Sequence, residues 1–267
     1  MIPEDAVERL LESAHLIGAA CERSNVQQWE VFASQAYGHS LDFEGGKISM
    51  ASGGGEGGFG LRVVENGSYG FAHLVDLSGV ERAVQEAVSI ARRSPSIEGF
   101  ELPSNHEVKS VGGMLDKNIL DLGPEELLEQ GDQVLTKAAE IDSRSCIVGG
   151  GIGISASAGA ILTSSGIEDG GVKTSHGIGV HISIDENDEL TSSYEGESSR
   201  KKLKDISSSV EKAIHWAQVT RGKVSGFDTE DCPVLMTSDG FSPLFSKVVP
   251  SAATGEMLAR GESFWSG

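Results

Sequence analysis

One glycine pattern in the sequence could bind a phosphate group. Gly55-Glu56-Gly57-Gly58-Phe59-Gly60 is a literal G-x-G-x-x-G, a spacing that lets backbone N–H groups approach a dinucleotide pyrophosphate. Such a site needs a helix directly after the glycines, because the positive end of the helix dipole favours the anion. Here the glycines are followed by apolar residues two positions apart, Leu61 and Val63, which is the period of a strand. The turn pair Asn66-Gly67 comes next. The pattern therefore favours a β-hairpin over a nucleotide-dependent enzyme.

The histidines and serines form no catalytic or metal-binding group that spacing alone reveals. No H-E-x-x-H and no histidine pair on one helical face occurs. His176 and His181 are five residues apart in a predicted strand, so we expect them on opposite faces. No G-x-S-x-G occurs, and Ser207-Ser208-Ser209 is typical of a turn or helix cap. Spacing therefore predicts no catalytic residue, no cofactor-binding residue and no metal ligand in this chain.

The charge balance and the cysteines restrict the class of protein. The 267 residues carry a formal net charge of −19, which repels phosphate backbones and anionic lipids. Cys21, Cys146 and Cys232 are far apart and form no C-x-x-C, a usage that fits a reducing compartment. No apolar run approaches the length of a membrane span, and no basic segment precedes an apolar one at the N-terminus. We expect a cytoplasmic protein with neither nucleic acid nor membrane as partner.

Hydrophobic periodicity predicts a mixture of amphipathic helices and short-turn antiparallel strands. In the stretch from Leu41 to His73 we expect a strand, a glycine-rich turn, a second strand, a tight turn at Asn66-Gly67 and a third strand. Ser78-Gly79-Val80-Glu81 reads as a capping box that begins a helix. The predicted helices are Pro3 to Arg23, Ser78 to Arg93, Pro124 to Glu140, Asp205 to Thr220 and, largely, Gly240 to Arg260. The other predicted strands are Trp29 to Tyr37, Ser40 to Phe43, Ile147 to Ser157, Val172 to Ile184 and a buried strand from Cys232 to Thr237.

The order of these elements indicates an internal repeat. Both Leu41 to Arg93 and Ala160 to Thr220 are expected to contain a strand, a glycine turn, a second strand, a polar turn, a third strand and a helix. Chance similarity between two glycine-rich hairpins is the alternative. The predicted fold class is α+β, with antiparallel sheets, amphipathic helices, two related α+β units and the start of a third, β-rich region. The predicted domains are residues 1–98, 99–227 and 228–267, the last one incomplete.

Three stretches of the sequence together resemble the TldD/PmbA family, the so-called modulators of DNA gyrase. FEGGKISMASGGGEGGFGLRVVENGSYGFAH resembles the family's N-terminal signature, and LTSSGIEDGGVKTSHGIGVHI resembles its middle region. PVLMTSDGFSPLFSKVVPSAATGEMLARGESFWSG resembles the beginning of its C-terminal region. The resemblance implies a cytosolic assembly that cleaves unfolded peptides inside a dimer. In that assembly a zinc-bearing TldD-type subunit pairs with a PmbA/TldE-type subunit that lacks the metal.

The family's zinc motif decides which kind of subunit the chain resembles. TldD-type members carry H-E-x-x-x-H on the helix that precedes a G-[TE]-S motif, which here is Gly261-Glu262-Ser263. The two histidine positions correspond to Ser246 and Ser251, and the glutamate position corresponds to Lys247. Neutral hydroxyls are poor zinc ligands and an ammonium group repels the ion. The resemblance therefore implies a PmbA/TldE-like chain with no cofactor of its own, and zinc in a TldD-type partner.

The resemblance leaves two questions open. Family members continue past the residues that match Gly267, so the chain is either truncated or a short member of the family. It is expected to help the proteolysis or maturation of unfolded peptides, as a dimer with a TldD-type subunit or with itself, and whether it is itself an enzyme is undecided. The alternative is a non-proteolytic peptide-binding or assembly module.

Overall fold

The computed structural model describes residues 2–103, 111–186, 189–222 and 233–265, which belong to two compact units. The larger unit contains residues 1–94 and 101–221, and the smaller one contains residues 95–100 and 222–267. Each unit is described by itself below.

The larger unit repeats one order of elements: a helix, three strands and a helix. The first set is α1 (Ala6–Arg23), β1 (Gln28–Glu44), β2 (Lys47–Glu65), β3 (Ser68–Leu74) and α2 (Val80–Ala91). The second set is α4 (Pro124–Ile141), β4 (Ser145–Thr163), β5 (Glu168–Glu186), β6 (Glu189–Ser199) and α5 (Ser207–Val219). Two short helices, η1 (Leu77–Gly79) and α3 (Lys117–Leu120), lie between them in sequence. The predicted α+β fold with two related units is confirmed.

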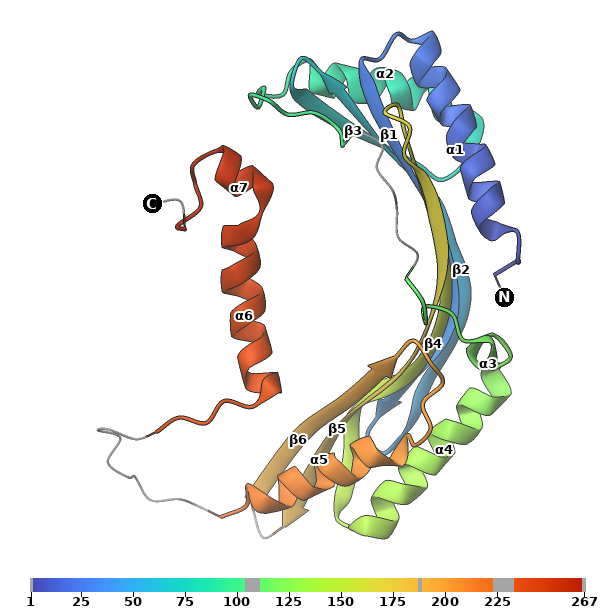
Figure 1. Cartoon of the computed structure of the whole chain (residues 1–267). Helices are drawn as coiled ribbons and strands as arrows, with labels where there is room; N and C mark the ends of the chain where they lie inside the picture. Colours follow the sequence, from blue (N-terminus) through green and yellow to red (C-terminus); the bar gives the residue numbers. More distant parts are fainter. Residues whose placement is uncertain (1, 104–110, 187–188, 223–232, 266–267) are drawn as a thin grey trace. The chain divides into compact units, whose positions relative to one another are not determined.

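Both sets contribute to one antiparallel sheet with the strand order β3-β2-β1-β4-β5-β6 (Figure 1). The two sets meet at the β1–β4 pair, which runs from Glu30 opposite Thr163 to Asp42 opposite Gly151. β1, β2 and β4 are long, curved strands, and the helices cover one face of the sheet they form (Figure 1). The proposed domain boundaries at residues 98 and 227 stay a prediction.

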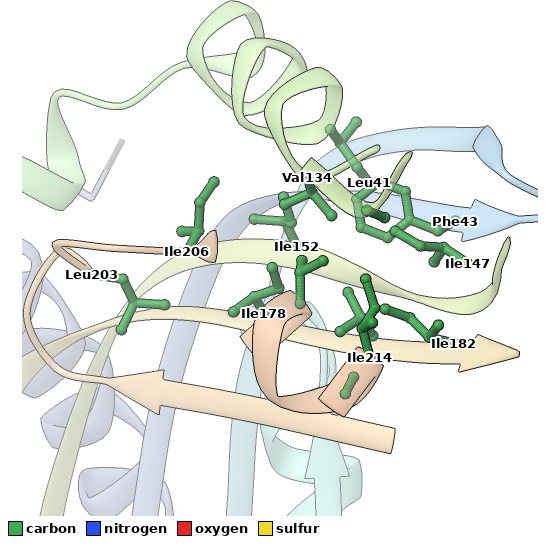
Figure 2. Packing of buried hydrophobic residues seen from close by; sticks show 14 of the residues in the cluster. Leu41, Phe43, Val134, Ile147, Ile152, Ile178, Ile182, Leu203, Ile206 and Ile214 are labelled. Carbon is green, nitrogen blue, oxygen red and sulfur yellow. The ribbon is translucent and has the colours of Figure 1, made fainter. Parts of the chain in front are cut away.

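The apolar core lies between the sheet and the helices, and it is thickest at the two ends of the sheet. At the β4–β5 end, Ile152, Ile178 and Ile182 pack against Val134 of α4 and Ile214 of α5 (Figure 2). At the β2–β3 end a second cluster includes Trp29, Ile17, Val31, Leu61 and Val84 beneath α1 and α2. Full burial of one such side chain contributes about 1.5–3 kcal/mol, so these clusters hold the helices to the sheet.

The glycine-rich run of residues 53–58 is part of a strand, and the predicted glycine-rich turn lies earlier in the chain. Gly45 and Gly46 form that turn, with φ of +58° and +75°, whereas residues 53–58 lie inside the strand. Within the run, Gly53 leaves room for the ring of His39, which lies where a Cβ on this glycine would be. The second predicted turn is confirmed, because Asn66 and Gly67 have φ of +53° and +76°.

The helices begin close to the predicted residues, with one change of cap. Ser78 does not cap α2; its N–H donates to the Asp76 carboxylate at 2.8 Å, and the 3₁₀ turn η1 precedes the helix. Pro124 begins α4 as expected, and the Gly123 N–H donates to Glu126 at 2.9 Å. Both carboxylates accept an N–H near a helix start, where the dipole is positive.

In the smaller unit the described residues form α6 (Ser238–Ala253) and α7 (Gly255–Ala259). This agrees with the predicted helical run. The buried strand predicted to end at Thr237 is wrong: residues 233–237 form no strand and Leu235 is 93% exposed, while Cys232 lies outside the described residues. A buried strand needs a neighbouring strand, and residues 233–265 provide only helices and loops. Throughout the described ranges of both units, no helix is long and apolar enough to cross a membrane.

Candidate functional site

Residues 47–58 of β2, called here the β2 edge, form an open side of the sheet. β2 pairs with β1 from Lys47 to Val64, but it pairs with β3 only from Phe59 onward. Residues 49–57 are exposed, and in the described chain no other segment hydrogen-bonds to this side of the strand. An open strand edge presents unpaired backbone N–H and C=O groups, with which an extended chain can pair.

The opposite end of the sheet has a comparable segment that is partly covered. Residues 168–175 of β5 pair with β4 alone, because β6 begins its pairing at His176. Here the N–H of Thr174 already donates to the carbonyl of Met114 at 2.9 Å. The N-terminal residues of the segment are Glu168 and Asp169, and such charges at an edge discourage strand addition. The β2 edge is therefore the better candidate for pairing.

A pocket of about 180 Å³, called here the ring pocket, lies over β1 and β4 on the helix-covered face of the sheet. It is lined by Tyr37, Gly38 and His39 of β1, by Ile154, Ser155 and Ala156 of β4, and by Ile119, Leu120 and Leu122 of α3 and the residues after it. The rings of Tyr37 and His39 meet edge to face, with centroids 5.2 Å apart and planes at 87°. The pocket thus has apolar walls of isoleucine and leucine and two aromatic rings.

The two rings give the ring pocket its polar atoms. In the described part of the chain neither the Tyr37 hydroxyl nor the His39 imidazole makes a hydrogen bond. Sequence reasoning did not single out His39, because the residues of α3 that complete the pocket are about eighty positions further along the chain. The predicted strands, Trp29 to Tyr37 and Ser40 to Phe43, left His39 between them, whereas in the structure the two are one strand, β1, and His39 lies opposite the glycine run.

His176 is structural rather than available for chemistry. It is fully buried on the helix-covered face, while His181 points to the other face, as predicted. Its Nδ1 accepts from the Leu203 N–H at 3.1 Å, which leaves the proton on Nε2, 3.1 Å from the Gln130 side-chain oxygen. Burial, with a smaller contribution from Lys202, lowers the pKa of His176. The neutral ring is therefore fully hydrogen-bonded in place.

A bidentate ion pair between Arg144 and Asp142 stabilises the fold. Arg144 donates to both carboxylate oxygens of Asp142, at 2.8 Å and 2.7 Å, and Gln218 of α5 donates to the same carboxylate at 2.9 Å. The Arg144 guanidinium holds the pKa of Asp142 well below its usual range. The contact joins the end of α4 to the start of β4 and to α5.

The residues that correspond to the zinc motif lie on α6. The hydroxyl of Ser246 donates to the Pro243 carbonyl at 3.2 Å, and that of Ser251 donates to the Val248 carbonyl at 2.9 Å. Both hydroxyls thus bond to their own helix, and Lys247 between them is exposed. This donor set does not suit zinc. Across the described residues, no group of three or more His, Cys, Asp or Glu side chains could hold a metal ion.

The comparison with protein families matches the region that contains the β2 edge. Residues 29–91, which span β1 to α2, match the model of PmbA/TldA metallopeptidase domain 1. Residues 29–91 therefore match a domain of the TldD/PmbA family. In family terms, the β2 edge and the rings of Tyr37 and His39 therefore lie within domain 1.

Solved structures similar to this chain show the same fold. TldE from Thermococcus kodakarensis superposes with a TM-score of 0.78 at 18% sequence identity. The match covers 95% of this chain and 57% of the TldE chain. A protein from Bacteroides thetaiotaomicron, described as a modulator of DNA gyrase, gives a TM-score of 0.78 at 20% sequence identity. The match covers 100% of this chain and 61% of the Bacteroides protein.

A curated relative is an uncharacterised protein of Methanocaldococcus jannaschii, 28% identical over 139 residues, which are 52% of this chain and 32% of that protein. The chain thus spans less than two thirds of the length of the proteins that it matches.

Proposed function

We propose that this chain is a PmbA/TldE-like subunit of a cytoplasmic TldD/PmbA-type peptidase system, and that it holds unfolded peptides in an extended form for proteolysis or maturation. The observation that carries the proposal is the β2 edge, an open and glycine-rich strand within the domain that matches the family. An unfolded peptide has free backbone groups, and strand addition binds it with little dependence on sequence.

The chemistry of α6 supports a subunit without its own metal. Ser246, Lys247 and Ser251 supply two hydroxyls and a cation where the family motif has two histidines and a glutamate. Zinc is expected in a TldD-type partner, with which this chain forms a dimer; self-association is the second arrangement to test. The net charge of −19 favours neutral or basic peptides over nucleic acid or anionic membranes.

A reconstituted cleavage assay tests the peptidase role. An unfolded peptide is incubated with this chain alone, with a TldD-type subunit alone and with both together. We expect cleavage only when the TldD-type subunit is present, stimulation when this chain is added, and loss of cleavage with a chelator. Cleavage by this chain alone that survives the chelator would contradict the proposal. Metal analysis of the isolated chain is expected to give well under one equivalent of zinc.

Backbone methylation of the peptide tests the binding mode. N-methyl groups on alternate residues remove the N–H groups along one edge of an extended peptide and leave its side chains unchanged. We expect at least a tenfold weaker Kd when the edge that faces β2 is methylated and a much smaller effect for the other edge. Equal Kd values for both methylated peptides and the parent would exclude strand addition.

A non-proteolytic peptide-binding or assembly module is the second candidate, because the donor set of α6 offers no catalytic metal. Affinity purification from the native cytoplasm distinguishes the two. Recovery of a zinc-bearing homologue supports the peptidase subunit, and its absence alongside intact peptide binding supports the module.

A further inference from the structure

The ring pocket gives the proposed peptide site a side-chain preference. We propose that the pocket accepts one aromatic or large aliphatic side chain of a segment paired with the β2 edge, so that an extended peptide with such a residue binds more tightly than one without it. The inference rests on the proposed function, because the peptide backbone must be held at the β2 edge for its side chain to reach the pocket.

The size of the pocket limits what it can accept. A cavity of about 150 Å³ holds a benzene ring, whereas pockets for drug-sized ligands start at about 300 Å³. At about 180 Å³ the ring pocket has room for one ring or one branched aliphatic group. It is therefore sized for a single side chain rather than for a free cofactor.

The register of the sheet places the two rings that line the pocket next to the β2 edge. Tyr37 lies opposite Gly55 and His39 lies opposite Gly53, and these pairs share the helix-covered face. The two glycines have no side chains, so nothing on β2 stands between a paired strand and the rings. The Tyr37 ring passes 3.4 Å from the place of a Cβ on Gly55, so it already extends over β2.

The distances suit a long side chain. Directly opposite positions on neighbouring strands have Cβ atoms about 5 Å apart. A residue paired opposite Gly53 or Gly55 therefore begins about 5 Å from the space that the Tyr37 and His39 rings occupy. A phenylalanine, tyrosine, leucine or methionine side chain can cross this distance, but serine or alanine cannot.

The lining decides the chemical class of the side chain. Ile119, Leu122 and Ile154 offer no polar side-chain atoms, so this part of the lining suits an apolar group. The edge-to-face pair of Tyr37 and His39 offers ring edges and faces on which a third aromatic ring can pack. An aromatic side chain is therefore the best fit.

Binding measurements with two matched peptides test the preference for an aromatic side chain. The probes are two synthetic peptides of alternating threonine and valine with lysine at both ends, one with a central phenylalanine and one with alanine at that place. For the unmodified chain we expect the phenylalanine peptide to bind at least tenfold more tightly. In Tyr37→Ala, and in a second variant, His39→Ala, the ratio should fall below about threefold. Each variant is first checked for an unchanged circular dichroism spectrum.

Phe32→Ala is the matched control. Phe32 is an exposed aromatic residue of the same strand, and it lies on the opposite face because it is an odd number of residues from Tyr37 and His39. The ratio of the two Kd values should stay at its original value in this variant. If both peptides bind but the ratio is unchanged by Tyr37→Ala and His39→Ala, the pocket is not the recognition element although the edge still binds peptide. If neither peptide binds, the proposed function itself fails.

Discussion

The two ends of the sheet and its middle use different residues for different purposes. The ends carry isoleucine, valine, leucine and tryptophan beneath pairs of helices. The middle is made of residues 34–40 of β1, 52–58 of β2 and 153–159 of β4, which the pairing register places side by side. Its sequences, SQAYGHS, SGGGEGG and GISASAG, contain mostly glycine, serine and alanine.

The difference indicates where stability and binding reside. Apolar area removed from water supplies most of the stabilisation of a fold, and that area is concentrated at the ends. The middle buries mainly small side chains such as Ala156 and Ala158, keeps one strand edge open and contains the ring pocket. Substitutions at the ends should therefore change the free energy of unfolding, whereas substitutions in the middle should change binding.

The largest effect is expected for Ile214→Ala. Ile214 is fully buried in the cluster between α5 and the β4–β5 end of the sheet. Removing its side-chain atoms leaves a cavity, and such changes cost about 2–5 kcal/mol. Urea denaturation should show a lower midpoint with an unchanged slope. A loss below about 1 kcal/mol would mean that this end is not the main source of stability.

Gly70→Ala is expected to have the next largest effect, about 1–3 kcal/mol, because α2 packs directly on β3 at this glycine. An added Cβ would meet the backbone of α2 at Ala87 and Ala91, which cannot move without moving the helix. Thermal unfolding followed by circular dichroism measures the loss. A midpoint within one degree of the parent value would contradict the close approach.

The His176 site should make the β4–β5 end sensitive to pH. The folded state lowers the pKa of this histidine, so the unfolded state binds more protons once the pH falls toward the ordinary histidine value of about 6.5. The stabilisation is present above that value and is lost as the pH decreases from it toward the lowered folded pKa. One proton can contribute a slope of at most about 1.4 kcal/mol per pH unit.

Urea denaturation between pH 7.5 and pH 5 measures this dependence. The His176→Gln variant serves as the control, because it removes the titrating ring while the other six histidines remain. The variant should be less stable at pH 7.5 yet show a shallower fall in stability toward pH 5. Parallel pH profiles would mean that protonation of His176 does not act on this end of the sheet.

Local signals predicted the elements of the ends, and nonlocal contacts explain what they missed. Asn66-Gly67 and Pro124 mark a turn and a helix start by their own backbone preferences, and both are where the sequence placed them. Glycine is frequent in turns, so the glycine run at residues 53–58 does not by itself mark the interior of a strand. The contact of the His39 ring with Gly53 depends on a strand pairing.

The ring pocket could not have been predicted from local sequence patterns either. Its residues come from β1, β4 and the region of α3, and they meet through pairing register and helix packing. The predicted roles of Ser246, Lys247 and Ser251 depend on the family resemblance, because no local pattern in α6 marks them. They stay predictions until zinc is measured.

The smallest effect on stability is expected in the middle of the sheet, for Gly54→Ala. No atom lies within 4 Å of the place where its Cβ would be, and the strand there is exposed. Since glycine is unfavourable in a strand, the change should alter the free energy of unfolding by no more than about 0.5 kcal/mol and with either sign.

Gly53→Ala, one residue away, sharpens the contrast between stability and binding. Its Cβ would meet the His39 ring, which can rotate away because it is a side chain, so the cost in stability should also stay within about 1 kcal/mol. The displaced ring would nevertheless change the ring pocket. We therefore expect Gly53→Ala to reduce the preference for the phenylalanine peptide while Gly54→Ala leaves that preference intact. If the two variants bind both peptides alike, the middle of the sheet holds peptide by its backbone alone.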